Sequence, residues 1–349
     1  MPGTSARPAA AEAHRFGEGE PFTLGIEEEL FLVDAATLDA APAFTRVVPE
    51  PTARIKAELF ACLVETTTPV CRTPEEVLRQ AQDLRAEVAR RAAPLGHTLL
   101  AAGTHPLARA AGQPIVPEPR YQQILAELGE AAYRQLVCGL HVHVGMPSAE
   151  ACLRALEGVL PWLPTLLSLS ANSPFVEGGD AGARSARADR LAELPAVGAP
   201  PPLRTWDDWE RATAGTDYTR LWWDARPHPR YGTLEVRIAD QQTDVRRSAA
   251  FAALVQALAA TAAEDARDPD PYDRARYAQR REEAASKEPD PLELDALARL
   301  VEPAARDLGG GKLVQELFAA RPEAERQLEI AARGGLEAVT RDVAERSLP

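Results

Sequence analysis

Three consecutive glutamates, Glu27, Glu28 and Glu29, stand within the otherwise apolar segment TLGIEEELFLV. Adjacent carboxylates repel one another, and a buried carboxylate without a partner is costly. In a strand, Glu27 and Glu29 would lie on one face and Glu28 on the other. The segment therefore raises the question of which positive charges these carboxylates face. For Glu28 we expect an arginine behind the sheet.

Two more strand-like segments carry polar residues on one face and apolar residues on the other. In GLHVHVG, His141 and His143 share a face opposite Leu and Val residues, and in TLEVRIAD the same holds for Glu235 and Arg237. If these strands join the glutamate strand in one sheet, a single face gathers carboxylates, imidazoles and a guanidinium. Such a face is typical of a site for metals and anions.

A fourth segment, ELFACLVETTTPV, adds Glu58 and Glu65. The two residues are seven positions apart, so an ideal strand would place them on opposite faces. Either a bulge reverses the alternation or Glu58 precedes the strand. The sequence leaves both alternatives open.

Each feature alone has a simpler interpretation. The acidic triplet could be a solvated edge strand, the two histidines a polar face, and Glu235 with Arg237 a cross-strand ion pair. Their joint occurrence on apolar strands favours a metal site instead. Carboxylate oxygens favour Mg²⁺ or Mn²⁺, while His141 and His143 keep a metal-dependent hydrolase as an alternative. The GGGKL segment lacks the hydroxyl residue of a phosphate-binding loop.

The composition excludes several classes of protein. The 349 residues include 39 basic and 52 acidic side chains, a net charge of −13, which argues against nucleic acid and acidic membranes as partners. The four cysteines form no CxxC pair, and no segment resembles a signal peptide or a membrane span. We expect a cytoplasmic protein that acts on small molecules; a homo-oligomer is possible in principle and is left open.

The order of the elements predicts an α+β fold. Strand patterns concentrate before residue 240 and helical patterns follow it. We expect a loose tail over residues 1–20, a single catalytic domain over residues 21–349, and an irregular loop over residues 172–204. A capping box at Thr73 predicts the start of a helix, and helices are expected over residues 245–264 and from residue 292 onward.

The segments in which these residues stand resemble the bacterial carboxylate–amine ligases, the glutamate–cysteine ligase type two family. The resemblance covers residues 22–244 and rests on TLGIEEEL, AELFACLVETTTPV, AAGTHP, PRYQQI, CGLHVHVG, ANSPF and WWDARPHPRYGTLEVRIAD. It implies a glutamine-synthetase-like catalytic domain, in which a curved, mainly antiparallel sheet forms a funnel with helices packed behind. It also implies an ATP-dependent ligase that phosphorylates the side-chain carboxylate of glutamate. An amine, cysteine by default, then attacks the acyl phosphate.

The resemblance also implies roles for individual residues, with ATP and Mg²⁺ (or Mn²⁺) as cofactors. Arg237 matches the arginine beside the transferring phosphoryl group, and Arg226 matches a second catalytic arginine. Asn172, Arg187 and Arg237 match cofactor-binding positions. The implied metal ligands form two sets: Glu27, Glu58 and Glu65, and Glu29, His141 and Glu235.

Three segments depart from the family pattern. GGDAGARSAR keeps Ser185 and Arg187 but alters the middle of its motif, YDRARYAQRRE replaces an Asn-Arg-Trp-rich segment, and RPEAERQL replaces a Gly-Thr-Ser-Ala-Asp-rich turn. These departures leave the amine open. They also leave open a catalytically inactive ATP-binding relative and a phosphotransferase that stops at the phosphorylated acceptor.

Overall fold

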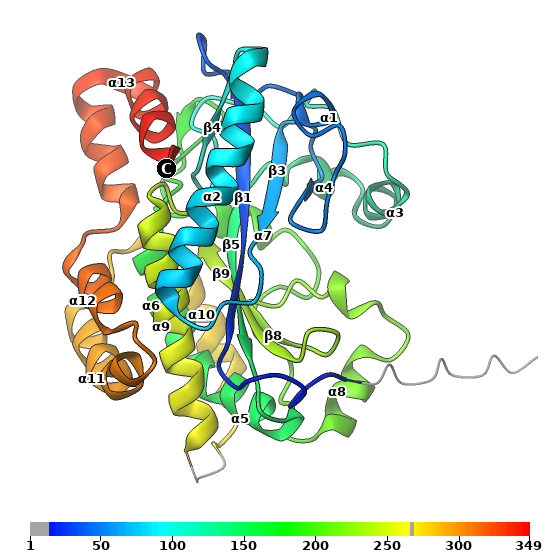
Figure 1. Ribbon diagram of the computed structural model, residues 1–349, viewed down its shortest axis with the longest axis vertical. Coiled ribbons are helices and arrows are strands. Elements are labelled where there is room, and N and C mark those ends of the chain that lie inside the picture. Colours follow the sequence, from blue (N-terminus) through cyan, green and yellow to red (C-terminus); the bar gives the residue numbers. More distant parts are fainter. Residues whose placement is uncertain (1–13, 266–268) are drawn as a thin grey trace, which may run out of the picture.

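An antiparallel sheet of seven strands forms the centre of the protein (Figure 1). The structure is a computed structural model that describes residues 14–265 and 269–349. The strand order is β2-β3-β1-β5-β9-β8, and β4 pairs with the far end of β1. A separate hairpin consists of β6 and β7. The strands are β1 (Leu24–Asp34), β2 (Ile55–Ala57), β3 (Leu63–Thr67), β4 (His97–Leu100), β5 (Gly139–Gly145), β6 (Phe175–Val176), β7 (Gly179–Asp180), β8 (Ala225–His228) and β9 (Thr233–Asp240).

The alternation expected for the glutamate strand is present in β1. Leu24, Ile26 and Glu28 are buried on one face, while Gly25, Glu27 and Glu29 are only partly buried on the other. The open question about the fourth segment is settled by its secondary structure. Since β2 ends at Ala57 and β3 begins at Leu63, Glu58 lies in the connection and is free of strand alternation.

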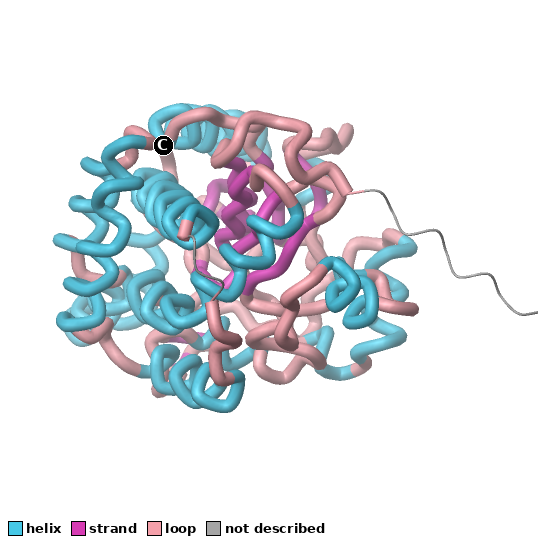
Figure 2. Tube along the Cα trace, turned by 90° about the horizontal axis from the view of Figure 1, so that it is seen from below, coloured by secondary structure: helices cyan, strands magenta, loops and turns pink. Residues whose placement is uncertain are grey.

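Helices cover one face of the sheet, and shorter helices and loops surround the other (Figure 2). The covering layer is formed mainly by α2, α5, α6 and α9, which contact β1, β5 and β9. Thr73 caps α2 as predicted, and α9 has the expected bounds. The α-helices are α1 (Phe44–Val47), α2 (Pro74–Ala92), α3 (Pro119–Leu128), α4 (Glu130–Tyr133), α5 (Ala149–Val159), α6 (Leu163–Ser170), α7 (Ala186–Leu191), α8 (Trp206–Thr213), α9 (Val245–Glu264), α10 (Arg274–Ser286), α11 (Pro291–Asp307), α12 (Gly311–Ala319) and α13 (Glu323–Ser347).

The middle glutamate of the triplet has the arginine partner that the sequence analysis expected. The carboxylate of Glu28 accepts hydrogen bonds from Nε of Arg85 at 2.9 Å and from Nη2 at 2.6 Å. Arg85 comes from α2 and is fully buried. Its Nη1 also donates to the backbone oxygen of Ser347 at 3.1 Å, which ties the end of α13 to the back of β1.

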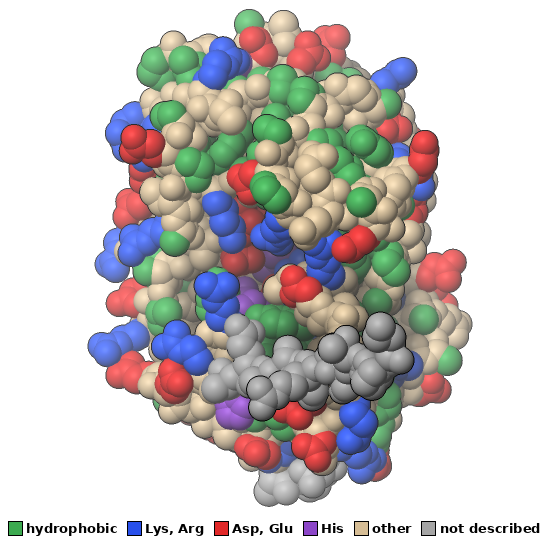
Figure 3. Space-filling model, turned by 90° about the vertical axis from the view of Figure 1, so that its right-hand side faces the viewer, with side chains coloured by type: hydrophobic (Ala, Val, Ile, Leu, Met, Phe, Trp, Pro, Cys, Tyr) green, Lys and Arg blue, Asp and Glu red, His purple; other side chains and the backbone are tan. Residues whose placement is uncertain are grey.

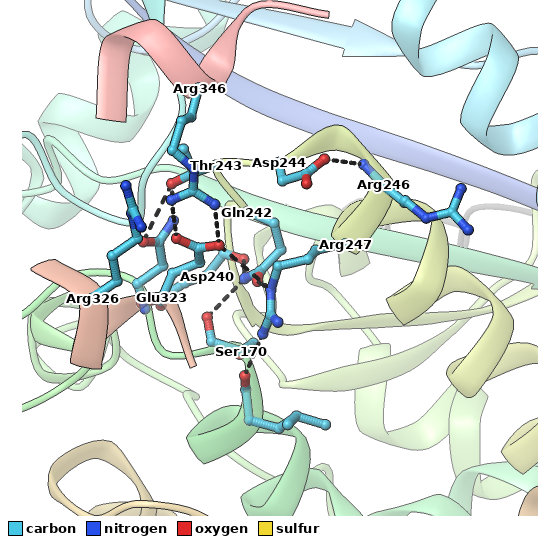
Figure 4. A network of polar contacts seen from close by, with 12 residues as sticks. Ser170, Asp240, Gln242, Thr243, Asp244, Arg246, Arg247, Glu323, Arg326 and Arg346 are labelled. Atoms are coloured by element: carbon cyan, nitrogen blue, oxygen red, sulfur yellow. Dashed lines mark hydrogen bonds and ion pairs between the residues drawn. The ribbon is translucent and has the colours of Figure 1, made fainter. Parts of the chain in front are cut away.

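A polar network holds α13 to the segment that follows β9 (Figure 4). Both guanidinium Nη atoms of Arg346 donate to the carboxylate of Glu323, at 2.6 and 2.7 Å. Glu323 also lies 3.9 Å from Arg247 of α9. Arg247 in turn donates to the side chain of Gln242 at 3.2 Å. The C-terminal helix is thereby fixed to the layer behind the sheet.

Two predictions about irregular segments differ from the structure. Residues 14–20, assigned to the loose tail, pack on the domain: Phe16 is buried, and its ring lies 5.5 Å from that of Trp206. The remainder of the predicted tail, residues 1–13, lies outside the described residues. The segment 172–204 contains the hairpin β6–β7 and helix α7, which Ser185 caps. Within residues 14–265 and 269–349, no helix has the length and apolarity needed to cross a bilayer.

Candidate active site

The register of the strands aligns the polar residues in rows across the front of the sheet. In one row, Lys56 of β2 faces Glu65 of β3, which faces Glu29 of β1. Glu27 faces His141 of β5. The last row lies nearer the β8 edge and pairs His143 with Glu235, and Glu235 with Arg226 of β8. The three strands predicted to share a face are therefore neighbours.

These rows open into one cavity of about 260 Å³. On the face that contains it, Lys and Arg side chains gather around acidic and histidine side chains (Figure 3). All six residues predicted as metal ligands line the cavity, and so do three of the four other predicted site residues. The lining residues from the predicted set are Glu27, Glu29, Glu58, Glu65, His141, Glu235, Arg187, Arg226 and Arg237.

Glu27, His143 and Glu235 form the tightest group of potential metal ligands among the described residues. One ligand atom from each lies within 4.8 Å of the others. Nε2 of His143 is buried and has no hydrogen-bond partner in the described part of the chain, while its Nδ1 lies 2.9 Å from the hydroxyl of Thr233. The hydrogen bond at one ring nitrogen orients the imidazole, and the other ring nitrogen is buried without a partner. This combination fits a metal ligand.

The second candidate group lies around Glu29, Glu58 and Glu65, whose charges are only partly balanced by lysine and arginine side chains. Burial and then the neighbouring Glu58 raise the pKa of Glu29 to about 7. Burial and then Glu27 raise the pKa of Glu65 well above its usual value, although Lys56 lies 2.9 Å away. Burial also raises the pKa of Glu58. Carboxylates crowded in this way favour a bound cation.

Two arginines neutralise Glu235. Nε of Arg226 donates to its carboxylate at 2.6 Å, and Nη1 of Arg237 makes a second contact. Burial would raise the pKa of Glu235, but these guanidinium groups, Arg226 first, hold it well below the usual value. The cluster thus combines a paired carboxylate with fixed positive charge, which suits an anionic substrate.

Arg187 reaches the cavity because β5 begins with a glycine. Its Nη1 and Nη2 donate to the backbone oxygens of Ile238 and Arg237 at 3.2 and 3.1 Å. A Cβ atom on Gly139 would lie 2.8 Å from Cζ of Arg187. The missing side chain therefore leaves room for the guanidinium beside the sheet.

Asn172 is the one predicted site residue that the structure does not bring to the cavity. Its side chain is fully buried behind the sheet. Nδ2 donates to the backbone oxygen of Gln241 at 2.7 Å and to the hydroxyl of Thr243 at 3.0 Å. Oδ1 accepts from Nε2 of Gln327 at 2.7 Å. Since these contacts join α13 to the segment after β9, Asn172 supports the site from behind.

The cavity lining also includes residues outside the predicted set, among them His143, Lys56 and Arg120. A signal existed for His143, because it shares the strand face of His141. Lys56 is one of only three lysines in the chain and stands two residues before Glu58. Arg120 lies at the start of α3, within PRYQQI. Nothing in its local pattern indicates that a helix start would reach the sheet.

A second, larger cavity of about 810 Å³ adjoins the first. Glu27, His143 and Tyr231 line both cavities. The second cavity extends over the loops around Gly17, Arg72 and Gly232. The candidate metal cluster therefore lies where the two cavities meet.

Comparisons with known proteins agree with the resemblance noted in the sequence. A model of glutamate–cysteine ligase family 2 (GCS2) matches residues 23–345. A protein of Rubrobacter xylanophilus named "Putative glutamate–cysteine ligase 2-3" is 42% identical over 262 residues, which cover 72% of each chain. A protein of Herpetosiphon aurantiacus named "Putative glutamate–cysteine ligase 2" is 39% identical over 249 residues, 68% of this chain and 65% of that protein.

Two solved structures share the fold. The glutamate–cysteine ligase of Francisella tularensis, solved in complex with AMP, has a TM-score of 0.69 at 13% identity and covers 94% of this chain and 89% of its own. A bifunctional glutathione synthetase of Pasteurella multocida has a TM-score of 0.66 at 15% identity and covers 94% of this chain and 51% of its own. At such identities the likeness concerns the fold alone, and it confirms the predicted glutamine-synthetase-like α+β architecture. The family match carries the assignment: the chain belongs to glutamate–cysteine ligase family 2 and is a ligase that forms carbon–nitrogen bonds.

Proposed function

We propose that this protein is an ATP-dependent carboxylate–amine ligase that activates the side-chain carboxylate of glutamate and couples it to an amine. One observation carries the proposal. A single cavity gathers carboxylates and imidazoles that could hold metal ions beside two arginines directed at the same space. The names of the relatives support glutamate as the acid and cysteine as the first amine to test.

The donor set fits Mg²⁺ or Mn²⁺. Glu27, His143 and Glu235 would hold one ion at the junction of the cavities, and Glu29, Glu58 and Glu65 would hold another. His141 lies between the groups, with Nδ1 3.2 Å from Glu27 and Nε2 3.7 Å from Glu29. This grouping exchanges Glu27 and Glu29 between the two sets implied by the resemblance and replaces His141 by His143. Bound divalent ions bridge phosphate oxygens and neutralise charge during phosphoryl transfer.

The two cavities suggest where each substrate lies. The larger cavity has room for the nucleoside, and exposed Val70 and Tyr231 at its lining offer apolar surface to a base. The γ-phosphoryl group would then lie at the junction, within reach of Arg237. Arg237 and Arg226 are held by Glu235, so their charges are oriented before substrate arrives. Such preorganisation is the main source of electrostatic catalysis.

The reaction balances in two steps. A carboxylate oxygen of glutamate attacks the γ-phosphorus, and the bond to the β-phosphate oxygen breaks and releases ADP. The amine nitrogen then attacks the carbonyl carbon, and the carbon–oxygen bond to phosphate breaks. The ammonium form of the amine loses two protons, one of which remains on the released phosphate.

The proposal is tested by trapping the acyl phosphate. With ATP, Mg²⁺ and glutamate, hydroxylamine should yield glutamyl hydroxamate together with ADP. Leaving out glutamate should abolish both products. ADP formation that is the same with and without glutamate would contradict the proposal.

A metal-dependent hydrolase is the second candidate, because Glu27, His143 and Glu235 could also hold a single ion. This function requires turnover without nucleotide. The match to a ligase family argues against it.

A further inference from the structure

One end of the smaller cavity is apolar. Beyond the carboxylates of Glu29 and Glu58, the lining consists of aliphatic side chains from three separate segments: the β2–β3 connection with the start of β3, helix α3, and α7 with the residues after it. These side chains are Leu59, Leu63, Ile124, Leu128, Leu191 and Leu194.

The elements that carry these side chains are joined by polar contacts of Gln135 and Tyr121, which also line the cavity. Nε2 of Gln135 donates to the backbone oxygens of Ala131 and Arg190, which links α4 to α7. The hydroxyl of Tyr121 donates to the backbone oxygen of Ala57 at 2.7 Å, which links α3 to β2. Arg120 of α3 and Arg187 of α7 also line the cavity, and the rest of the lining from these elements is largely hydrocarbon. Leu128 and Leu191 are only partly buried, so part of that hydrocarbon is open.

A buried acceptor at this end lacks a hydrogen-bond partner among the described residues. Oε1 of Gln135 is buried and accepts no hydrogen bond from any described residue. Its identity as the oxygen is fixed because the other amide atom donates to two carbonyl groups. A buried acceptor without a donor costs free energy unless a ligand supplies an N–H or O–H group.

We propose that this end is the acceptor subsite and that it takes a primary amine with an apolar substituent larger than the side chain of cysteine. The hydrocarbon part would lie against the leucines and Ile124. The amino group would face Oε1 of Gln135 and the carboxylates of Glu29 and Glu58. This inference rests on the proposed ligase function and names the class of its second substrate.

The proposed place of the nucleotide leaves this end free. Under the proposed function the nucleoside would lie in the cavity of about 810 Å³, which shares Glu27 and His143 with the smaller cavity. The triphosphate must then approach the metal cluster from that side. The apolar end lies past the second group of carboxylates, where only the acid and the amine remain to be placed.

The inference is tested with a panel of matched amines, with ADP release measured at fixed ATP and glutamate. The kcat/KM for leucine should exceed that for alanine by about tenfold or more, because each methylene that fills an apolar pocket contributes to discrimination. Cysteine should be a poorer substrate than 2-aminobutyrate, which replaces its thiol by a methyl group. Isoamylamine, which is leucine without its carboxylate, shows whether that carboxylate contributes to binding of the amine. A high rate with leucine or with isoamylamine supports the inference.

A variant isolates the apolar lining. Leu191→Asn should lower the ratio of kcat/KM between leucine and alanine by about tenfold. A ratio measured within one protein is insensitive to partial misfolding. The matched control is Leu292→Asn on α11, a leucine that is 78% exposed and far from the cavity lining, and it should keep the wild-type ratio.

The outcomes separate this inference from the proposed function. Hydroxamate formation without any preference for apolar amines would leave the ligase function standing and overturn the acceptor assignment. In Leu191→Asn, a raised KM for ATP with an unchanged ratio of kcat/KM between leucine and alanine would assign the apolar end to the nucleoside. That result would also overturn the acceptor assignment. Failure to form hydroxamate would remove the ligase function, and this inference with it.

Discussion

Glu28 and Glu29 are neighbours on one strand, yet the protein treats their charges in opposite ways. Behind the sheet, burial would raise the pKa of Glu28, but Arg85, with help from Ser248 and Gln241, lowers it below the usual value. In front, burial and Glu58 raise the pKa of Glu29 to about 7. The only difference between the two positions is the face of β1 on which each side chain lies.

The contrast distinguishes a structural charge from one kept for a ligand. Glu28 accepts hydrogen bonds from Arg85, Gln241 and Ser248, so its charge is neutralised within the protein. Glu29 accepts one hydrogen bond, from the backbone nitrogen of Gly139 at 2.6 Å, and Arg187 and Arg237 offset only part of the effect of burial and of Glu58. The arginines of this face do not bring the pKa of Glu29 back to its usual value, and a bound cation would supply further positive charge. Substituting each of the two glutamates by glutamine tests this comparison directly.

Glu28→Gln should have the largest effect on stability. The substitution leaves the charge of Arg85 buried without a counter-ion, and breaking a buried ion pair costs about 3–5 kcal/mol. We expect the free energy of unfolding, measured in urea, to fall by that amount. The matched control is Glu302→Gln, whose partner Arg306 is 65% exposed, and it should change the free energy by less than about 1 kcal/mol. Equal losses in the two variants would contradict the structural role of Glu28.

Glu29→Gln should have the opposite effect: turnover should fall, and the free energy of unfolding should not. Turnover with ATP and glutamate should fall by about 10²–10³-fold, the usual cost of removing one electrostatic contact to a reacting group. The free energy of unfolding without metal should not fall, because a carboxylate that faces Glu58 is removed and the amide oxygen can still accept from Gly139. Urea unfolding in the presence of a chelator measures this directly. A stability loss as large as that of Glu28→Gln would show that Glu29 is structural.

The sequence predicted that these side chains share one face of the sheet, because strand alternation is local. His141, Glu235 and Arg237 could be assigned to one face from their spacing alone, and the register then brought those faces together. The family resemblance supplied what spacing could not, namely Glu65 and Arg187. Asn172 was misplaced relative to the cavity because its position depends on contacts with Gln327, 155 residues away. The apolar end was missed for the same reason, since the β2–β3 connection, α3 and α7 come together only in the folded chain.

His105 extends the comparison to a second buried titratable group behind the site. Its Nδ1 accepts from the backbone nitrogens of Leu107 and Ala108, at 3.1 and 3.0 Å, and its Nε2 lies 2.9 Å from the oxygen of Leu38. This arrangement needs the neutral ring, and burial lowers its pKa to about 4. In the unfolded chain the imidazole binds a proton at a higher pH than in the folded protein. The stability that neutral His105 contributes is therefore complete above pH ~6.5 and is lost as the pH falls toward ~4.

The measurement is the difference in free energy of unfolding between pH 7.5 and pH 4.5 for the wild type and for His105→Gln. The wild type should lose about 2–3 kcal/mol more over this interval than the variant. Glutamine removes the titrating group but retains a donor and an acceptor. Identical pH dependence in both proteins would show that His105 is not held neutral.

Gly139→Ala should have the smallest effect on stability among these substitutions. It tests whether the position of Arg187 beside Glu29 matters for turnover. The added Cβ would lie 2.8 Å from Cζ of Arg187, so the guanidinium must move away from Glu29 and from the backbone oxygens of Ile238 and Arg237. Overpacking of this kind costs about 1–3 kcal/mol, and we expect a loss of about 1 kcal/mol in the free energy of unfolding because Arg187 is flexible. Turnover should fall by about tenfold, since misplaced groups reduce the rate more than binding.

The control is Gly179→Ala, in the exposed hairpin, where the nearest atom to the added Cβ is an ordinary contact at 3.9 Å. If Gly139→Ala loses stability but keeps full turnover, Arg187 lines the cavity without taking part in the reaction.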